Sequence, residues 1–230
     1  MGPTDPYVTP VLDWNSVPGV QNVVPALGDG VEDAIADRGV AERRAAYAAE
    51  ARRLIDAAFV VMRRSGSIDP QVRAIVQEAG LSNQAFYRHF ASKDALLLAV
   101  LADGQRQLVA YLRRRVATAS SPAEQVQRWI NGVMAQARDH DAAEATRPFA
   151  CNSARLADLF PADLAASRAE MLESLTPAVQ ALGGSGHDAE LVRDLALARM
   201  NDAIAHRRVP SKGEIQRLVE FCLAGINGAR

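Results

Sequence analysis

Apolar residues recur at every third or fourth position along most of the chain, which is the spacing of helices that bury one face. The first clear stripe, within residues 41–66, contains Leu54, Ala58 and Met62. Gly66 is suited to end that helix, because glycine readily adopts the left-handed conformation of a helix terminus. No alternation of polar and apolar residues extends far enough to predict a strand. The chain is therefore predicted to be all-α, with about nine helices.

Capping residues divide the next segment into separate helices. Asp69 and Pro70 are expected to start a helix that ends at Gly80. A carboxylate can accept hydrogen bonds from free N–H groups at a helix start, and proline suits the first turn. Ser82 is expected to cap a second short helix, and Ser92 a longer one of about twenty-five residues.

Later helices also begin at recognisable caps. Ser121 with Glu124, and Ser211 with Glu214, have the spacing of a capping box, in which side chains and backbone N–H groups bond reciprocally. Prolines and a Gly-Gly-Ser-Gly turn interrupt the chain between these two starts. Helical stretches are expected there near residues 148–158, 162–182 and 188–207.

Proline content and charge indicate the domain boundaries. Five of the eleven prolines lie within residues 1–40, so this amino-terminal extension is expected to lack a long helix. It would be either mobile or packed on the body or on a partner. Residues 41–93 carry nine basic and five acidic side chains, whereas residues 94–230 carry sixteen of each. Charge therefore separates a basic segment, residues 41–93, from a neutral body.

Few residues offer catalytic or metal chemistry. Cys151 and Cys222 form no paired motif, and the histidines and cysteines lack the spacing of metal ligands. Neither a phosphate-binding glycine loop nor a nucleophile elbow occurs, so no cofactor, metal or catalytic residue is predicted. The sequence shows no secretory signal and no apolar run of about 20 residues. We expect a soluble intracellular protein.

The segment AGLSNQAFYRHFASKDAL, residues 79–96, combines aromatic rings with polar and basic groups. Two short helices joined by a glycine-containing turn predict a helix-turn-helix at about residues 71–90, whose second helix enters the DNA major groove. Helical spacing places on the inner face Leu81, Ala85, Phe86 and Phe90. The outer face then carries Asn83, Gln84, Tyr87 and Arg88, with His89 at its edge. Amide and guanidinium groups can pair with base edges, and a hydroxyl or ammonium group can reach phosphate.

Around this segment the chain resembles the tetracycline-repressor (TetR) family of bacterial regulators. The resemblance covers residues 50–102 and rests on AG-L-S followed by F-Y-x-H-F-x-S-K-x-x-L, which ends at Leu96. It implies that eight residues contact DNA: Ser82, Asn83, Gln84, Ala85, Tyr87, Arg88, His89 and Lys93. Of these, the residues from 82 to 85 would lie towards the bases. Tyr87 and His89 would lie at the sugar–phosphate wall, and Lys93 would bind a phosphate.

Two departures from the family pattern change these expectations. The family usually starts its second helix with a Thr or Ser whose hydroxyl meets a phosphate, whereas this chain has Asp69 and Pro70. A carboxylate near a phosphate is unfavourable, so that contact is expected to be lost or moved. The usual Gly-Thr pair before the aromatic residue is Gln84-Ala85 here, which changes the groups that could touch a base.

The resemblance also implies two domains, residues 41–102 and residues 103–230, of which the second binds a ligand and forms a dimer. The last two helices would pair with their copies through Leu191, Leu195, Ile215, Leu218, Val219 and Cys222. A pocket among the preceding helices would be lined by Leu108, Tyr111, Trp129, Met134, Phe149, Met171 and Leu175. An ordinary packed core is the alternative interpretation for all of these residues, and for those of the pocket it is the more common one.

The sequence therefore predicts a homodimeric, sequence-specific transcriptional regulator in the bacterial cytoplasm, associated with the nucleoid. Its partners would be a palindromic double-stranded DNA operator, a second copy of itself, and a small molecule that releases the operator, as in a repressor. Three alternatives stay open: an activator, a dimeric DNA-binding protein that needs no ligand, and a helical enzyme that uses Cys151 as a nucleophile. No membrane contact is expected.

Overall fold

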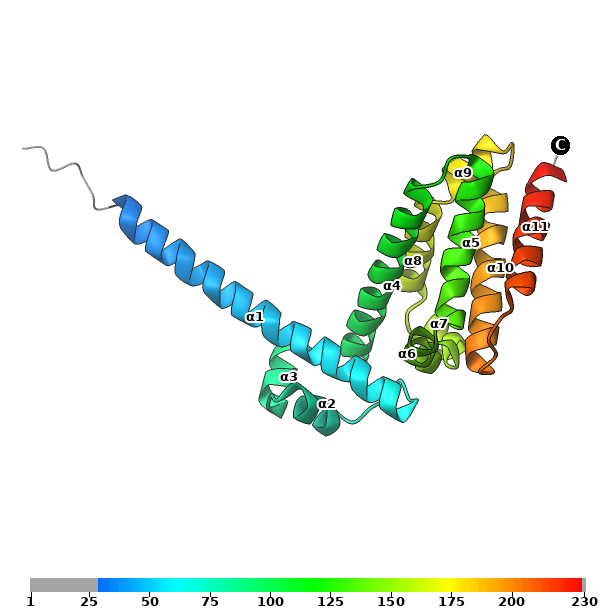
Figure 1. The fold of residues 1–230 in the computed structure, drawn as a ribbon. Coiled ribbons are helices and arrows are strands. Elements are labelled where there is room, and N and C mark those ends of the chain that lie inside the picture. The colour runs from blue at the N-terminus through cyan, green and yellow to red at the C-terminus, as the bar shows by residue number, and fades with distance from the viewer. Residues whose placement is uncertain (1–28, 229–230) are drawn as a thin grey trace, which may run out of the picture. The chain divides into compact units, whose positions relative to one another are not determined.

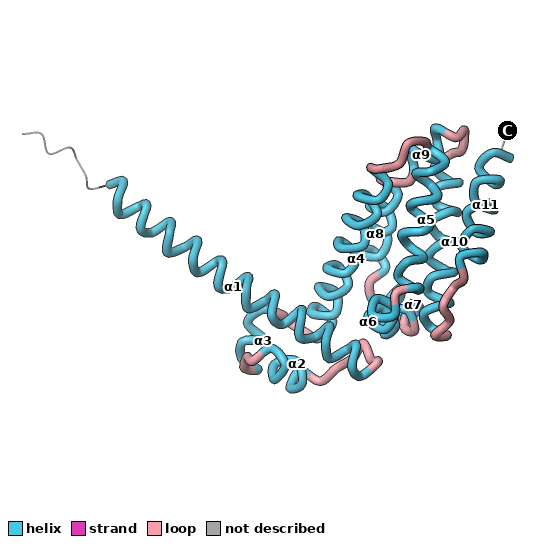
Figure 2. The backbone as a smooth tube through the Cα atoms, in the orientation of Figure 1, coloured by secondary structure: helices cyan, strands magenta, loops and turns pink. Residues whose placement is uncertain are grey.

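The computed structural model describes residues 29–228, and every regular element within them is an α-helix (Figure 1, Figure 2). These residues form eleven helices, α1 to α11, which confirms the all-α prediction. The number exceeds the expected nine because some stretches that the sequence pattern predicted as continuous are divided by turns.

The first helix, α1 (Asp29–Ser65), begins earlier than the apolar pattern predicted. The expectation of an irregular extension is therefore wrong for residues 29–40, which are helical, while residues 1–28 lie outside the described residues. The physical reason is the distribution of proline. No proline lies between Pro25 and Pro70, so no residue in that interval removes a helical hydrogen bond.

The chain forms two units, residues 1–47 and residues 48–230. The apolar stripe of α1 lies in the second unit, where Leu54 and Met62 are almost fully buried. The end of α1 is as predicted: Gly66 has a φ of 69°, in the left-handed region, and its N–H donates to the Met62 carbonyl at 2.8 Å.

Three helices pack with α1 around one apolar core, which we call the head core. They are α2 (Val72–Ala79), α3 (Asn83–His89) and the first half of α4 (Lys93–Ala117). The largest fully buried side chains of the head core include Leu54, Met62, Ile75, Phe86 and Leu96. Leu156 and Phe160, from much later in the chain, also belong to it. The head core is thus completed by residues outside the predicted helix-turn-helix domain.

A second core surrounds α5 (Pro122–Arg138), which packs against several helices of the carboxy-terminal part (Figure 1). These neighbours are α4, α6 (His140–Ala150), α9 (Thr176–Ala181), α10 (Gly186–Ala205) and α11 (Lys212–Gly228). The two remaining helices are α7 (Ser153–Leu159) and α8 (Pro161–Glu173). The second core contains the fully buried Trp129, Ile130 and Leu175.

Among the described helices, α4 alone has the length and apolar content that could span a membrane. Its apolar side chains are instead shared between the two cores. Leu96, Leu97 and Val100 lie in the head core, and Val109, Leu112 and Val116 lie in the second core. The apolar character of α4 therefore follows from its position, because this one helix contributes side chains to both the head core and the second core.

Two predicted serine caps are confirmed. The Ser82 hydroxyl accepts a hydrogen bond from the Ala85 N–H at 3.1 Å, and the Ser92 hydroxyl accepts one from the Ala95 N–H at 3.0 Å. Each cap satisfies a backbone donor that the first turn of a helix leaves without an intrahelical partner. The limits of α3 and α4 are therefore determined by local residues.

The predicted cap at Asp69 is wrong. α2 begins at Val72 rather than Pro70, and Gln71, the residue before it, has an extended backbone and no side-chain cap. The Asp69 carboxylate instead forms an ion pair with Lys93. A charge-assisted hydrogen bond to an ammonium group is stronger than one to a neutral backbone N–H, so the distant partner displaces the local one.

One capping box is confirmed and one is altered. The Ser211 hydroxyl accepts from the Glu214 N–H at 3.2 Å, and the Glu214 carboxylate accepts from the Ser211 N–H at 2.7 Å. The Ser121 hydroxyl also accepts from the Glu124 N–H at 3.2 Å. The Glu124 carboxylate, however, accepts from the Ser120 N–H at 2.7 Å, one residue earlier than expected.

The predicted helical stretches of the carboxy-terminal half are divided by turns. Pro148 lies inside α6 instead of starting a helix, and a turn at residues 151–152 separates α6 from α7. The stretch at residues 162–182 is divided into α8 and α9. α10 starts two residues earlier than expected, from a Ser185–Asp188 capping box that the sequence analysis missed.

Candidate nucleic-acid interface and ligand cavity

A tight turn joins α2 to α3. Gly80 has a φ of 61°, and the Leu81 N–H after it donates to the Val76 carbonyl at 2.9 Å. Arg53 of α1 fixes the outside of this turn, because its guanidinium donates to the carbonyls of Ala79 at 2.5 Å and Gly80 at 3.2 Å. α1 thereby holds the two short helices at a set angle, as a helix-turn-helix requires.

The inner face of α3 is an aromatic anchor. Phe86 is fully buried, and its ring meets the Tyr87 ring edge-on at 5.1 Å between centroids and the Phe90 ring at 6.1 Å. Aromatic pairs in these arrangements contribute about 0.5–1.5 kcal/mol beyond the burial of their area. Such an anchor allows a helix of only seven residues to present a fixed outer face.

Four predicted DNA contacts lie exposed on or beside α3: Ser82, Asn83, Gln84 and Tyr87. The Tyr87 side chain is the most prominent apolar group there, with 62% of its surface exposed. Arg88 is also exposed, and its guanidinium pairs with Glu50 of α1. These side chains form a polar surface that we call the reading face.

Two predicted DNA contacts point inward instead. Ala85 is only 5% exposed and packs with Phe86, so it cannot present its methyl group to a base edge. The His89 side chain is 1% exposed, and its Nε2 lies 2.9 Å from a Glu50 carboxylate oxygen. Helical periodicity had placed His89 at the edge, but the contact with α1 buries it. Both residues hold α3 in place.

Glu50 links α1 to the end of α3, and sequence reasoning did not identify it. Hydrogen bonds from His89 and then from Arg88 hold the pKa of its carboxyl below the ordinary value. Glu50 precedes His89 by 39 positions, so no local pattern could have indicated the pair. At the other edge, Lys93 is the first residue of α4 and pairs with Asp69, whose pKa is lowered mainly by that ammonium group.

A cavity of about 280 Å³ lies between α4 and the carboxy-terminal helices. Three of the seven predicted ligand-binding residues line it: Leu108, Phe149 and Met171. The other four do not. Trp129, Met134 and Leu175 are buried in the second core, and the Tyr111 ring is covered by the Arg115 guanidinium at 5.5 Å.

The polar lining of this cavity was not predicted. The seven polar side chains at its wall are Gln105, Gln136, Thr146, Ser153, Ser167, Arg168 and Asn201. Among the described lining residues there is no Asp, Glu or His, and Arg168 carries the single formal charge. These residues come from six different helices, which explains why no sequence motif joins them.

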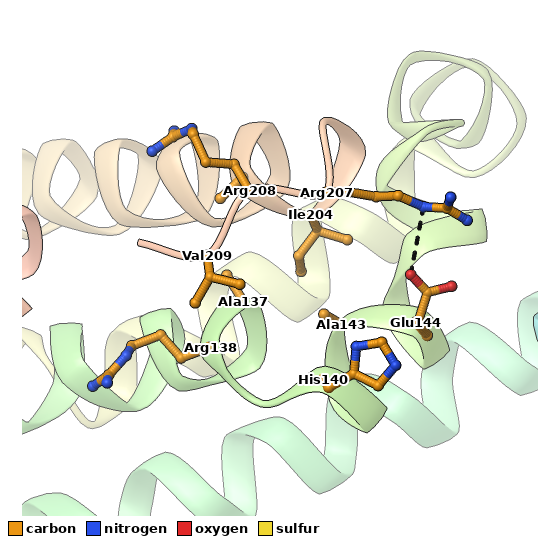
Figure 3. Close-up of a pocket in the computed structure, with 10 residues that line it drawn as sticks. Ala137, Arg138, His140, Ala143, Glu144, Ile204, Arg207, Arg208 and Val209 are labelled. Atoms are coloured by element: carbon orange, nitrogen blue, oxygen red, sulfur yellow. Dashed lines mark ion pairs between the residues drawn. The ribbon is translucent and has the colours of Figure 1, made fainter. Parts of the chain in front are cut away.

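A second hollow, of about 460 Å³, lies where the α5–α6 turn meets the α10–α11 connection (Figure 3). Its charged groups are largely paired within the chain: Arg207 lies 3.6 Å from Glu144, and Arg208 bonds Asp202 and Glu214. The first cavity is therefore the better candidate for an apolar ligand, because its wall is mostly apolar and its polar groups are mostly uncharged.

The predicted dimer residues divide into two sets. Ile215, Val219 and Cys222 are at most 5% exposed and pack inside the second core of this chain, so they are not available to a partner. Leu195 and Leu218 are half-buried. Leu191 on α10 is 54% exposed, and Phe221 on α11, which the sequence analysis missed, is 69% exposed.

Comparison with known proteins follows the same division of the chain. Residues 54–100 match the family described as bacterial regulatory proteins, tetR family. The HTH-type transcriptional regulator BetI of Brucella canis is 36% identical over 75 residues, which are 33% of this chain and 38% of BetI. The match thus spans little more than a third of the length of that relative.

Two solved structures share the fold over a larger part of the chain. A proposed TetR-family transcriptional regulator from Mesorhizobium loti has a TM-score of 0.61 and 22% identity, over 79% of this chain and 96% of the other. The fatty acid degradation regulator FadR from Bacillus halodurans has a TM-score of 0.60 and 19% identity, over 76% and 95%. At these identities the likeness concerns the fold.

Proposed function

We propose that this chain, whose residues 54–100 match the tetR family of bacterial regulatory proteins, is a homodimeric repressor of the bacterial cytoplasm. It would leave a palindromic operator when a small molecule binds its carboxy-terminal part. The observation that carries this proposal is the reading face, where polar side chains stand on a short helix anchored by the buried Phe86.

The reading face has the chemistry for both kinds of DNA contact. Asn83 and Gln84 carry amide groups that can donate to and accept from adenine in the major groove. The Ser82 and Tyr87 hydroxyls and the Lys93 ammonium surround them and suit phosphate oxygens. Ala85 and His89 are left out of the proposed contacts because they lie inside the domain.

Dimerisation would use the exposed apolar residues of the last two helices. Leu191 and Phe221 stand on the outer surfaces of α10 and α11, and Leu195 and Leu218 are half-buried on the same helices. A single reading face makes few base contacts, so a two-fold dimer doubles them on an operator whose half-sites lie about one helical turn apart.

The cavity favours a regulator that a ligand releases from DNA over a DNA-binding protein that needs no ligand. α4 carries Lys93 at its start, and eleven positions later Gly104 lines the cavity wall. A ligand that binds better when α4 is shifted would favour the shifted state and so move Lys93 relative to the operator. The lining predicts an apolar ligand with a neutral or anionic polar group, since no carboxylate is present to neutralise a cation.

Selection of bound sequences from random DNA tests this function directly. The unmodified chain should enrich a palindrome, with affinity that falls steeply as salt rises. Tyr87→Ala should weaken binding by roughly tenfold, as expected when a hydrogen bond to a charged group is lost. Arg114→Ala, at an exposed site in the last turn of α4, is the control and should bind normally. Enrichment of no sequence would refute the proposal.

The ligand is tested on the enriched operator with three sets of apolar compounds that carry a carboxylate, an uncharged polar group or an amine. Release is expected from the first two sets. Release by amines alone would contradict the assigned cavity chemistry, and release by none of the three sets would favour the ligand-independent alternative. Labelling of Cys151, which is exposed, should leave DNA binding intact.

A further inference from the structure

One acidic side chain is paired with a proposed phosphate-binding group. Asp69 is 49% exposed, and its carboxylate accepts a hydrogen bond from the Lys93 ammonium. Lys93 is 47% exposed, so both members of the pair can be reached from solvent. An operator phosphate and the Asp69 carboxylate would therefore compete for the same ammonium group.

The position of Asp69 is fixed by the backbone around it. Ile68 before it is 3% exposed and packs in the head core, and Pro70 after it is also buried. The Asp69 N–H donates to the Ser67 hydroxyl at 3.1 Å. With the chain held on both sides, the backbone of Asp69 stays in place and keeps the carboxylate within reach of Lys93.

A second cation lies near this carboxylate. Arg155 of α7 lines the same narrow crevice as Asp69 and Lys93, and its charge adds to the effect of Lys93 in lowering the pKa of Asp69. The next residue, Leu156, packs in the head core and also lines the ligand cavity. Arg155 is therefore attached to the segment that connects the cavity with the head.

We propose that Asp69 is an intramolecular competitor of operator phosphate for Lys93, and that Arg155 limits this competition by attracting the same carboxylate. The inference rests on the proposed DNA-binding function. Solvent-exposed ion pairs are weak, so DNA can displace the carboxylate. Asp69 then lowers affinity by roughly two- to fivefold in each subunit and does not abolish binding.

The test compares Asp69→Asn, Lys93→Gln and the double variant with the unmodified chain, by anisotropy of a labelled operator across a salt series. Asp69→Asn should bind more tightly, by about four- to twenty-five-fold for a dimer. In a plot of log affinity against log salt concentration, the slope for Asp69→Asn should be steeper by about 0.9 for each Lys93 ammonium that is freed to bind phosphate. In the Lys93→Gln background, Asp69→Asn should have little effect.

Asp94→Asn is the matched control for charge. Asp94 follows Lys93 directly, lines the same crevice, and forms no ion pair among the described residues. Equal gains from Asp69→Asn and Asp94→Asn would overturn the proposal, because only local charge would then be involved. Weaker binding by a folded Asp69→Asn would overturn it as well.

Arg155→Gln tests the second half of the proposal. It should weaken binding in the unmodified chain and leave binding unchanged in Asp69→Asn, because Arg155 would act only through that carboxylate. Equal losses in both backgrounds would refute this role. A protein that selects no DNA at all refutes the proposed function, whereas normal binding without an Asp69 effect refutes this inference alone.

Discussion

Two glycine-to-alanine substitutions should change stability in opposite directions. Gly80 has a φ of 61°, and a Cβ atom there would lie 3.2 Å from the Arg53 Nη2. The left-handed conformation costs an alanine about 1–2 kcal/mol. Gly104 lies inside α4 with nothing within 4 Å of an added Cβ atom. Alanine there should stabilise the helix by about 0.8–1 kcal/mol.

Thermal denaturation of the ligand-free chain measures both effects, at one protein concentration because the proposed dimerisation would make Tm depend on concentration. For a chain of this size, 1 kcal/mol shifts Tm by about 2–4 °C. Gly80→Ala should therefore lower Tm by about 2–8 °C, and Gly104→Ala should raise it by about 2–4 °C. Tm shifts of the same sign would refute the reasoning, because the effect of a glycine-to-alanine substitution would then not depend on the backbone conformation at its site.

The remaining predictions concern thiols and acid stability. Cys151 is exposed, whereas burial raises the pKa of the Cys222 thiol to about 11. An aromatic disulfide reagent at pH 8 should thus modify Cys151 in the native chain and Cys222 only in urea; fast native labelling of Cys222 would contradict its burial. Hydrogen bonds from Ser120, then Arg128, lower the pKa of Glu124 to about 2, against an ordinary value of 4.5. The ionised carboxylate therefore stabilises the folded state above pH 4.5, and this stabilisation is lost as the pH falls towards 2. In Glu124→Gln, the free energy of unfolding in urea should fall less over that pH range than in the unmodified chain. Identical pH profiles for the two proteins would contradict this prediction.

The reading helix was largely predictable from local residues. The Ser82 cap, the left-handed Gly80 and the buried Phe86 each follow from the residue type and from neighbours within four positions. A cap or a turn depends on hydrogen bonds within one short segment, so a few consecutive residues are enough to predict it. The exposed side of α3 then follows from helical periodicity.

Predictions failed where a distant group competed for the same atoms. Asp69 was expected to cap α2 but pairs with Lys93, which is 24 positions away, and His89 is buried by its contact with Glu50. The cavity shows the same limit. Its wall is built from several helices and has no linear motif, so three of the residues predicted to bind a ligand lie at the wall and four lie elsewhere.

The sequence by itself determined the helical class, the limits of α3 and α4, and the match of residues 54–100 to the tetR family. Only the tertiary structure decided which carboxylates pair with Arg88 and Lys93 and which polar groups reach the cavity. The physical reason is that caps and periodicity act between near neighbours in the chain. Charge pairing and cavity shape depend on how separate helices pack, and many distant partners are possible for each side chain before folding.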